Sequence, residues 1–299
     1  MKVAILGASG YIGKALSLLL NHQYQVYPID RRSAIDLKDH DFDMIINCIG
    51  RTPDKKDFSF QEYKEANYDI LKKVLPDFMN SKCKAFIQFS SISAVEEESS
   101  LTEVTEETPC TPTTDYGKTK RMGEEYLLAY PITTGKKIII LRPARIHGPG
   151  ERGTIYKLFK FIVKGIPYPF GKFSNKRSFL SIDNLYFLIQ SIIENHTRLE
   201  TGIYNIADDE ALSTADIIRC IERKTGRKKT ILNIPKKVIF LIGSVGNILH
   251  LPINKTTIAK LTSTRIISNN KIKNSLGVKK LPFTAEEGLI KTITSFNTP

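Results

Sequence analysis

A tyrosine and a lysine four residues apart, Tyr116 and Lys120, form a pair that could move a proton. On a helix this spacing puts both side chains on one face, about 5–6 Å apart at Cβ. A nearby ammonium group lowers the pKa of a phenol from its ordinary value of about 10, so that the phenol loses its proton more readily. The pair is therefore a candidate for acid–base chemistry.

The same spacing occurs three more times in the chain, in Tyr68/Lys72, Tyr156/Lys160 and Tyr168/Lys172. Tyr68 and Tyr156 fall inside helical patterns as ordinary, partly exposed residues, and Tyr168 stands between prolines, where helical spacing has no meaning. Tyr116 differs because it opens a predicted helix 25 residues after Ser91, which ends an apolar strand. Since strand carboxyl ends line the ligand crevice of a doubly wound sheet, we expect Ser91 and Tyr116 to meet at one substrate oxygen.

Three glycines in the segment GASGYIG, namely Gly7, Gly10 and Gly13, stand between an apolar strand and an apolar helix. Glycines let the backbone turn tightly and approach a pyrophosphate, whose charge is attracted by the N–H groups at the start of the helix. In this position the motif predicts a dinucleotide site rather than a merely structural turn. The other residues of the turn expected to contact the cofactor are Ser9, Tyr11 and Ile12.

The end of the second predicted strand bears on the choice between NAD and NADP. Asp30 lies 23 residues after the first glycine, near the ~20-residue offset of the acid that binds the ribose hydroxyls, and this favours NAD. Arg31 and Arg32 follow directly and would instead neutralise the 2′-phosphate of NADP. Both cofactors stay open, with NAD preferred. Asp36 and Leu37 are expected against the adenine, and an exposed loop acid is the alternative for Asp36.

Strands that alternate with helices are expected to hold these residues. Strands are predicted at 2–7, 24–30, 44–50, 85–91 and 137–143, and helices at 11–22, about 60–79 and 116–130. This alternation predicts an α/β protein with a doubly wound parallel sheet.

After Gly150 the pattern breaks into shorter elements, which predicts a small mixed α/β C-terminal cap. The helices expected there are 184–195, 214–224 and 236–249, and the strands are 179–182 and 203–206. We expect residues 1–150 to form the dinucleotide-binding domain, with segments at about 177–206 returning to it. Residues 151–299 would then form mainly the substrate-binding cap.

From the composition we expect a soluble protein of the cytoplasm. Apolar and charged contents of 41% and 25% are ordinary for a globular protein. No apolar run approaches the ~18 residues of a membrane span, and the first residues lack the plan of a signal peptide. The four cysteines are scattered without disulfide or metal-ligand spacing, so we expect a reduced protein without a metal site.

The net charge of +13 lies entirely in the last quarter of the chain. Residues 1–218 contain 28 basic and 28 acidic residues, whereas residues 219–299 contain 16 basic and 3 acidic ones. Such a region attracts a polyanionic small ligand, an anionic membrane or nucleic acid, and a solvated surface is the plain alternative. Nucleic acid is not expected, because the region has few aromatics and no known binding module.

One segment within this basic region combines apolar residues with flanking charge. The stretch VIFLIGSVGNILHL at 238–251 follows Lys236 and Lys237. It could lie on an anionic membrane surface and give a weak association through the cap, and ordinary packing in the cap core is the alternative.

Several motifs resemble those of the extended short-chain dehydrogenase/reductase family, whose fold is the Rossmann sheet. They are GASGYIG, the serine strand FSSISA, the Tyr116/Lys120 pair and LRPARIHGPG. Further on, NKRSFLSIDNL, GIYNIADDEALSTADII and NNKIKNSLG resemble the nucleotide-sugar epimerase, dehydratase and reductase branch, which includes UDP-hexose 4-epimerases and 4-ketoreductases. The resemblance covers nearly the whole chain and implies NAD(P)-dependent hydride transfer on a nucleotide-diphosphate sugar.

The resemblance implies a role for each residue of the candidate catalytic set. Tyr116 removes or donates the proton on a sugar oxygen, and Ser91 hydrogen-bonds the same oxygen. Lys120 holds the nicotinamide ribose and lowers the tyrosine pKa. Acid–base help of this kind contributes ~10²–10⁴-fold to the rate. Ser90 and Ser93 are the alternatives for the serine role.

Further binding residues follow from the same resemblance. Those expected at the cofactor are Cys48, Gly50, Asn67 and Pro143. For Asn67 the alternative is plain polarity on a helix surface. Arg177 matches the arginine that binds the sugar-nucleotide diphosphate, a task suited to the donor fork of guanidinium. Arg265 is the nearest candidate for a second diphosphate arginine, and Arg145 is expected at the substrate although relatives often have asparagine or an apolar residue there. Ser91, Ser93 and Tyr116 complete the expected substrate contacts.

Missing residues narrow the reaction. No Asp–Glu pair follows Ser91, which a 4,6-dehydratase would need, and the serine strand has no cysteine for 3,5-epimerisation. His147 is interpreted as a structural substitute for a tyrosine common at its position. The best remaining hypothesis is a 4-epimerase, with a 4-keto-sugar reductase as the alternative. A non-catalytic dinucleotide-binding sensor or scaffold is a third reading. Relatives also suggest a homodimer, formed through the helix that starts at Tyr116 and the helix before it.

Overall fold

The computed structural model describes residues 1–30, 37, 41–53, 58–96, 102–165, 167–226, 231–248, 258 and 262–296. Its centre is a six-stranded sheet in the order β2-β1-β3-β4-β5-β8, in which every neighbouring pair is parallel. The strands are β1 (Lys2–Leu6), β2 (Gln25–Ile29), β3 (Met44–Asn47), β4 (Ala85–Phe89), β5 (Lys137–Pro143) and β8 (Gly202–Ile206). This sheet confirms the predicted doubly wound parallel fold.

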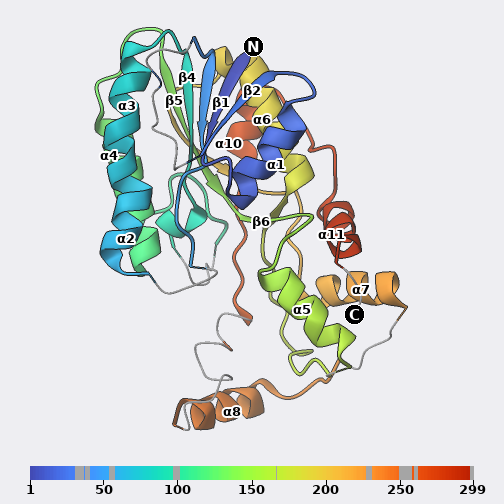
Figure 1. Ribbon diagram of the computed structural model, residues 1–299. Helices are drawn as coiled ribbons and strands as arrows, with labels where there is room; N and C mark the ends of the chain where they lie inside the picture. The colour runs from blue at the N-terminus through green and yellow to red at the C-terminus, as the bar shows by residue number, and fades with distance from the viewer. Residues whose placement is uncertain are drawn as a thin grey trace.

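Helices cover both faces of the sheet, because successive strand residues point to opposite sides. In β1, Val3 and Ile5 join one apolar cluster, and Ala4 and Leu6 join the other. The first face carries α1 (Tyr11–Leu20), α6 (Ile182–Asn195) and α10 (Asn270–Leu276), and the second carries α3 (Ile70–Asn80) and α4 (Asp115–Ala129) (Figure 1). The short helix α2 (Phe60–Lys64) and a π-helical segment, Glu65–Asp69, lead into α3.

The sheet order reverses at β1, and this fixes where a ligand can bind. The chain passes from β1 to β2 on one side and returns to β3 on the other. In open α/β sheets the ligand crevice lies beyond the carboxyl ends of the strands at such a reversal. The glycine turn after β1 and the loop after β3 both lie at this point, which we call the carboxyl edge of the sheet.

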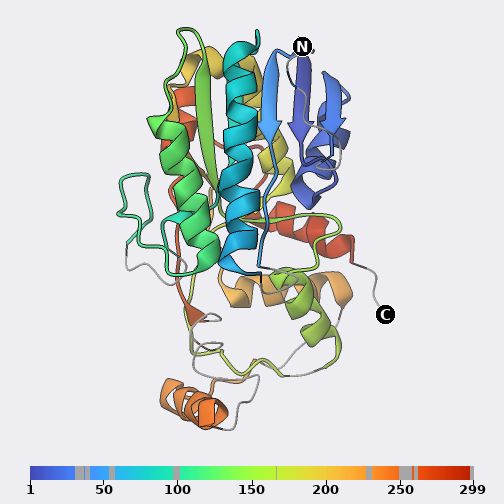
Figure 2. The same cartoon turned by 60° about the vertical axis from the view of Figure 1, so that its left-hand side comes forward.

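Beyond the carboxyl edge lies a smaller set of elements with its own apolar cluster, which includes Phe159, Ile218 and Leu289. Its elements are β6 (Arg145–His147), α5 (Thr154–Val163), β7 (Phe179–Ser181), α7 (Thr214–Thr225), α8 (Lys236–Ile248) and α11 (Ala285–Thr294). Two short 3-10 turns, Ile92–Ala94 and His196–Arg198, complete the described elements. Figure 2 shows this part below the sheet. Across the described ranges, we find no helix of the length and apolar character that a membrane span requires.

Candidate active site

The glycine turn after β1 has no room for side chains at two of its three glycines. Gly7 has a positive φ of 75°, and a Cβ there would stand 2.9 Å from the backbone nitrogen of Ile49. A Cβ at Gly13 would stand 2.3 Å from the carbonyl oxygen of Gly7. The turn is therefore pressed against α1 and the loop after β3, in the way that a dinucleotide cradle requires.

The start of α1 is prepared for an anion. Gly10 caps α1 in an extended conformation without a side-chain hydrogen bond, so no capping side chain occupies the first N–H donors of the helix. Ser9 donates from Oγ to Oδ1 of Asp30 at 2.9 Å, which brings the predicted ribose acid to the turn. Tyr11 extends to Gly148, and burial and Glu151 raise the pKa of its phenol.

Two other predicted cofactor residues, Ile12 of the glycine turn and Leu37 at the adenine, contact the apolar clusters. Ile12 packs against the first apolar cluster. Leu37 is fully buried in the second cluster. Arg31, Arg32 and Asp36 lie outside the described residues, so the contact to a 2′-phosphate stays a prediction.

Lys120 reaches from α4 to the end of β4. Its Nζ donates to the carbonyl oxygen of Phe89 at 3.0 Å, and the residue is only 6% exposed. Burial lowers the pKa of this ammonium to about 8, although Glu124 and Cys48 favour the charged form. A Cβ at Gly50 would stand 2.9 Å from Nζ, so the amine lies directly under the loop after β3.

Tyr116 lies in the first turn of α4, at the same edge as Ser91. Thr114 caps α4 by accepting from the N–H of Gly117 at 3.1 Å, and the ring of Tyr116 is tilted against that of Tyr63 with centroids 5.9 Å apart. The 3-10 turn Ile92–Ala94, which follows Ser91, packs against α4. Ser91, Tyr116 and Lys120 thus all lie at the carboxyl edge of the sheet.

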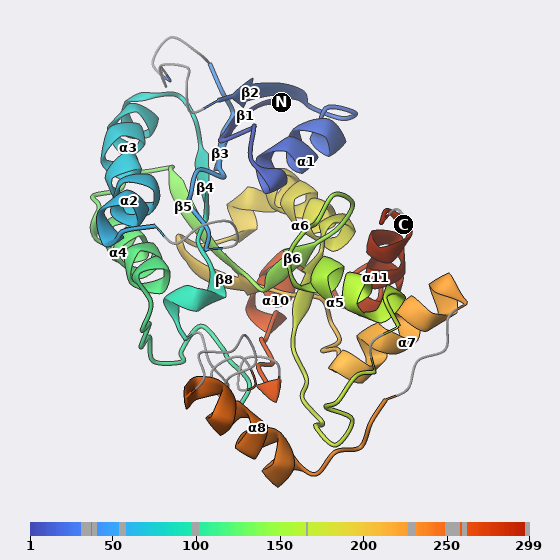
Figure 3. The ribbon, with the colours of Figure 1, turned by 60° about the horizontal axis from the view of Figure 1, so that its bottom comes forward.

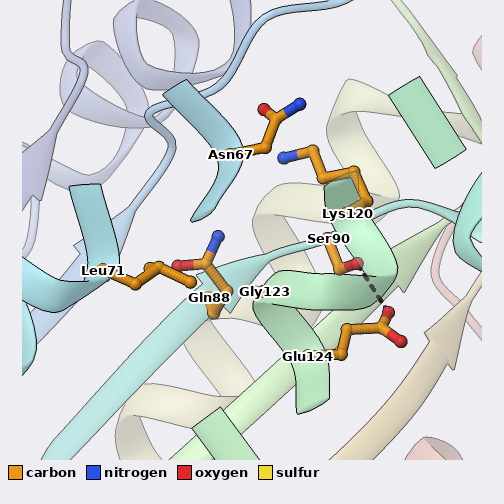
Figure 4. Close-up of a pocket in the computed structure, with 7 residues that line it drawn as sticks. All are labelled: Asn67, Leu71, Gln88, Ser90, Lys120, Gly123 and Glu124. Carbon is orange, nitrogen blue, oxygen red and sulfur yellow. Dashed lines mark hydrogen bonds between the residues drawn. The ribbon is translucent and has the colours of Figure 1, made fainter. Parts of the chain in front are cut away.

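The hydroxyl groups of the neighbouring serines have different partners. Ser90 donates from Oγ to Oε1 of Glu124 at 2.6 Å, in a pocket beneath Lys120 (Figure 4). Ser93 donates its backbone N–H to Oγ of Ser91 at 3.2 Å. Because the hydroxyl of Ser90 is bound to Glu124 under α4, Ser91 suits the serine role better than Ser90 does.

Glu124 is a site residue that sequence reasoning missed. It is 1% exposed and accepts from Nε and Nη2 of the buried Arg142 at 2.8 and 2.7 Å. The sequence held a signal, since Glu124 follows Lys120 by four residues and therefore shares its helix face. This buried pair holds the end of β5 against α4 below Lys120.

The other Tyr-x-x-x-Lys pairs serve packing. Nζ of Lys72 lies 4.4 Å from the ring centroid of Tyr68, and Nζ of Lys160 lies 5.6 Å from that of Tyr156. Tyr168 is 5% exposed within the apolar cluster beyond the carboxyl edge. In two of the pairs the ammonium covers the tyrosine ring, whereas Lys120 binds the end of a strand.

Asn67 belongs to the interior rather than to a helix surface, so the alternative interpretation is wrong. It is 2% exposed, donates from Nδ2 to Oγ1 of Thr119 at 3.1 Å and accepts from the N–H of Arg51 at 3.1 Å. Its π-helical turn is a feature frequent at functional sites. Two further predicted cofactor residues lie at strand ends. Cys48 directly follows β3, and burial raises the pKa of its thiol to about 12. Pro143 is the last residue of β5.

Three arginines from separate segments come together beyond the sheet edge. Arg177 forms backbone bridges with Leu212 and with Arg265. Burial and the positive charges of Arg265 and Arg145 lower the pKa of Arg177 to about 10. Arg265 also donates from Nη1 to the carbonyl oxygen of Glu96 at 2.8 Å. Positive charges that interact in this way attract a ligand with several negative charges.

His147 does not belong to this arginine cluster. It is fully buried on β6, with Nδ1 2.8 Å from Oγ1 of Thr292 on α11. This contact agrees with the structural role expected for it.

Comparison with known proteins places these features in a family. The model of the NAD dependent epimerase/dehydratase family matches residues 3–207. A UDP-glucose 4-epimerase of Vibrio cholerae is 27% identical and covers 98% of this chain and 95% of its own. An Escherichia coli O157:H7 protein is named N-acetyl-alpha-D-glucosaminyl-diphospho-ditrans,octacis-undecaprenol 4-epimerase. It is 24% identical over 97% of this chain and 94% of its own. The solved UDP-glucuronic acid 4-epimerase of Bacillus cereus with NAD superposes at a TM-score of 0.76, with 21% identity and 99% and 98% coverage.

Proposed function

Because the chain belongs to the NAD dependent epimerase/dehydratase family, we propose that it is a 4-epimerase of nucleotide-diphosphate sugars. Membership in this family confirms the predicted NAD(P)-dependent enzyme. The names of the Vibrio and Bacillus proteins support reaction at C4 and a UDP-linked sugar. We propose a UDP-hexose or UDP-N-acetylhexosamine as the substrate.

The arginine cluster is the observation that carries this proposal. Arg145, Arg177 and Arg265 are drawn from three separate segments, and burial together with repulsion from Arg265 and Arg145 lowers the pKa of Arg177 to about 10. A diphosphate carries the two negative charges that would offset this repulsion, and guanidinium groups match its oxygens in pairs. The cluster lies beyond the same sheet edge as the candidate catalytic residues, so one substrate could contact both.

The residues of the carboxyl edge fit NAD(P). The turn at Gly7 and Gly13 excludes side chains, α1 begins without a capping side chain, and Asp30 lies at the turn. Gly50 lets the loop after β3 lie directly on the amine of Lys120, since a Cβ there would stand 2.9 Å from Nζ. When bound, the cofactor supplies a hydride acceptor and donor.

The proposed roles of the chain's own side chains follow from their positions. Ser91 donates a hydrogen bond to the oxygen on C4 and orients it. Tyr116 takes the proton of the 4-hydroxyl as C4 becomes a ketone and returns it when the ketone is reduced on its other face. The ammonium of Lys120 lowers the pKa of that phenol. The arginines hold the diphosphate while the sugar turns.

The test is turnover with a matched pair of variants. We expect the purified protein to release NAD on denaturation, as detected by mass spectrometry, and to interconvert UDP-glucose with UDP-galactose or the N-acetylated pair. Tyr116→Phe should lower kcat by roughly 10²–10⁴-fold while retaining the cofactor. Tyr68→Phe should keep full activity, because its lysine only covers the ring. Equal activity in the wild type and Tyr116→Phe would refute the proposal.

Two other outcomes would change the assignment. A protein that releases no cofactor and consumes NADPH with a 4-keto sugar would be a reductase. Arg31 and Arg32 favour this outcome, since they could neutralise the 2′-phosphate of NADPH. A protein that binds NAD without turnover of any sugar would be a sensor or scaffold.

A second carrier for the sugar must be included in the assay. The E. coli relative is named for a sugar on undecaprenyl diphosphate. Exposed apolar side chains on α8 favour this substrate class for the present chain. Turnover of the polyprenyl-linked sugar alone would replace the nucleotide in the proposal.

The remaining expectations are part of the same proposal. We propose that the apolar cluster around α5, α7 and α11 is the core of the substrate-binding cap, and that the enzyme acts in the cytoplasm. A homodimer through α3 and α4 is proposed as well, with Leu128 exposed on α4. Sedimentation velocity with Leu128→Glu tests the dimer.

A further inference from the structure

Exposed apolar side chains concentrate on α8. Eleven large apolar side chains are exposed within the described ranges, and six of them lie between residues 232 and 245. Four of these, Val238, Leu241, Ile242 and Val245, follow the i, i+3, i+4, i+7 spacing and form one stripe, the outer face of α8. They are between 43% and 65% exposed. Contiguous exposed apolar patches on soluble proteins often mark a binding site, so we infer that the outer face binds a partner.

The opposite side of α8 contacts the rest of the chain, although Phe240 on that side is itself 46% exposed. Ile239 is 3% exposed and belongs to the cap cluster. The ring of Phe240 meets that of Phe173 edge-on, with centroids 6.1 Å apart. These contacts fix the rotation of the helix. Packing in the cap core therefore accounts for Ile239 and leaves the outer face unexplained.

Positive charge surrounds the outer face. Residues 223–285 contain 14 lysines and arginines and no acidic residue. Lys236 and Lys237 are exposed at the start of α8, where the helix dipole is also positive and no acid offsets it. A combination of apolar stripe and flanking lysines matches a bilayer with anionic headgroups, which offers acyl chains and phosphates at one surface.

The position of α8 leaves it accessible to a flat surface. It lies at the outer end of the molecule, beyond α5 and α7, on the side where the sheet strands end (Figures 1 and 3). We propose that the outer face of α8 inserts into the interface of an anionic bilayer while Lys237, which flanks this face, binds lipid phosphates; the ammonium of Lys236 lies over the ring of Phe173, 5.4 Å from its centroid, on the other side of the helix. The carboxyl edge of the sheet, with the candidate catalytic residues, then faces the same bilayer. This proposal does not depend on which sugar the enzyme converts.

Vesicle sedimentation with the full chain tests the proposal. The probes are sucrose-loaded phosphatidylcholine vesicles, with and without ~30% phosphatidylglycerol. We expect the protein to pellet with the anionic vesicles, and binding to fall as NaCl rises and the Debye length shrinks from about 10 Å to about 3 Å. Neutral vesicles should bind it much less.

Two single variants separate the outer face from a general charge effect. Leu241→Glu should lower the partition coefficient by about tenfold or more, because the new carboxylate enters the interface and is repelled by it. Leu18→Glu on α1 is the matched control, since Leu18 is also 65% exposed and the charge change is identical. It should bind nearly as the wild type does, and both variants should retain wild-type turnover in solution.

Three results would overturn the proposal. The first is an absence of binding to anionic vesicles at low salt. The second is an equal loss of binding in Leu241→Glu and Leu18→Glu. The third is a stable dimer in sedimentation velocity that Leu241→Glu dissociates, which would make the outer face a subunit interface.

Discussion

Replacing Lys120 by methionine should stabilise the protein while removing its activity. Folding holds the pKa of this ammonium at about 8 instead of 10.5, which costs on the order of 3 kcal/mol at pH 7. The variant loses the hydrogen bond from a charged ammonium to the carbonyl of Phe89, worth about 1.5–3 kcal/mol, and gains an apolar side chain of similar length in a buried site. We therefore expect Lys120→Met to be up to about 1.5 kcal/mol more stable at pH 7.

The stability difference between the wild type and Lys120→Met should also depend on pH. Between pH 8 and 10.5 the unfolded chain keeps the lysine proton and the folded chain does not, so wild-type stability rises with pH in that window. The difference should therefore shift towards the wild type by roughly 2 kcal/mol between pH 7 and pH 9.5. Urea unfolding of protein stripped of dinucleotide measures both quantities.

A second lysine provides the control for this measurement. Lys72 is half-exposed over the ring of Tyr68, so Lys72→Met should change stability by less than about 0.5 kcal/mol at either pH. The reasoning fails if Lys120→Met is less stable than the wild type at pH 7, or if its advantage is the same at pH 7 and pH 9.5.

Three further substitutions test the site. Gly13→Ala should lose bound dinucleotide and at least about 2 kcal/mol of stability, since its Cβ meets a carbonyl oxygen at 2.3 Å; mass spectrometry and urea unfolding measure these losses. Glu124→Ala should cost about 3–5 kcal/mol by leaving Arg142 buried without its carboxylate, whereas Glu125→Ala, on the exposed side of α4, should cost little in the same unfolding assay. Arg177→Ala should raise KM for a UDP-sugar by about tenfold or more while kcat changes less. If kcat falls by the same factor as KM rises, Arg177 does more than bind the diphosphate.

The parts of the site that depend on local spacing could be predicted from the sequence. The glycine turn follows a strand at once, and the Tyr116/Lys120 pair needs only one helix turn and the preceding strand. The sheet itself follows from the alternation of apolar strands and helices. In each case residues near in sequence determine the geometry.

The parts that depend on tertiary packing could not be predicted. Residue spacing alone does not bring Arg145 and Arg265 to Arg177, because the three arginines lie on segments that meet only in the folded chain; the expectation that all three contact the substrate came from the family resemblance. Ser90 and Ser91 are both plausible in the sequence, and only the position of Glu124 on α4 separates them. The burial that lowers the pKa of Lys120 is likewise a property of the packed structure.

The location of α8 affects how the enzyme would meet its substrate. Since α8 and the carboxyl edge of the sheet lie on one side of the molecule, a chain bound to lipid would search for its substrate over an area instead of a volume (Figure 1). Local enrichment of any donor at that surface would then raise the encounter rate without a single additional contact in the catalytic pocket.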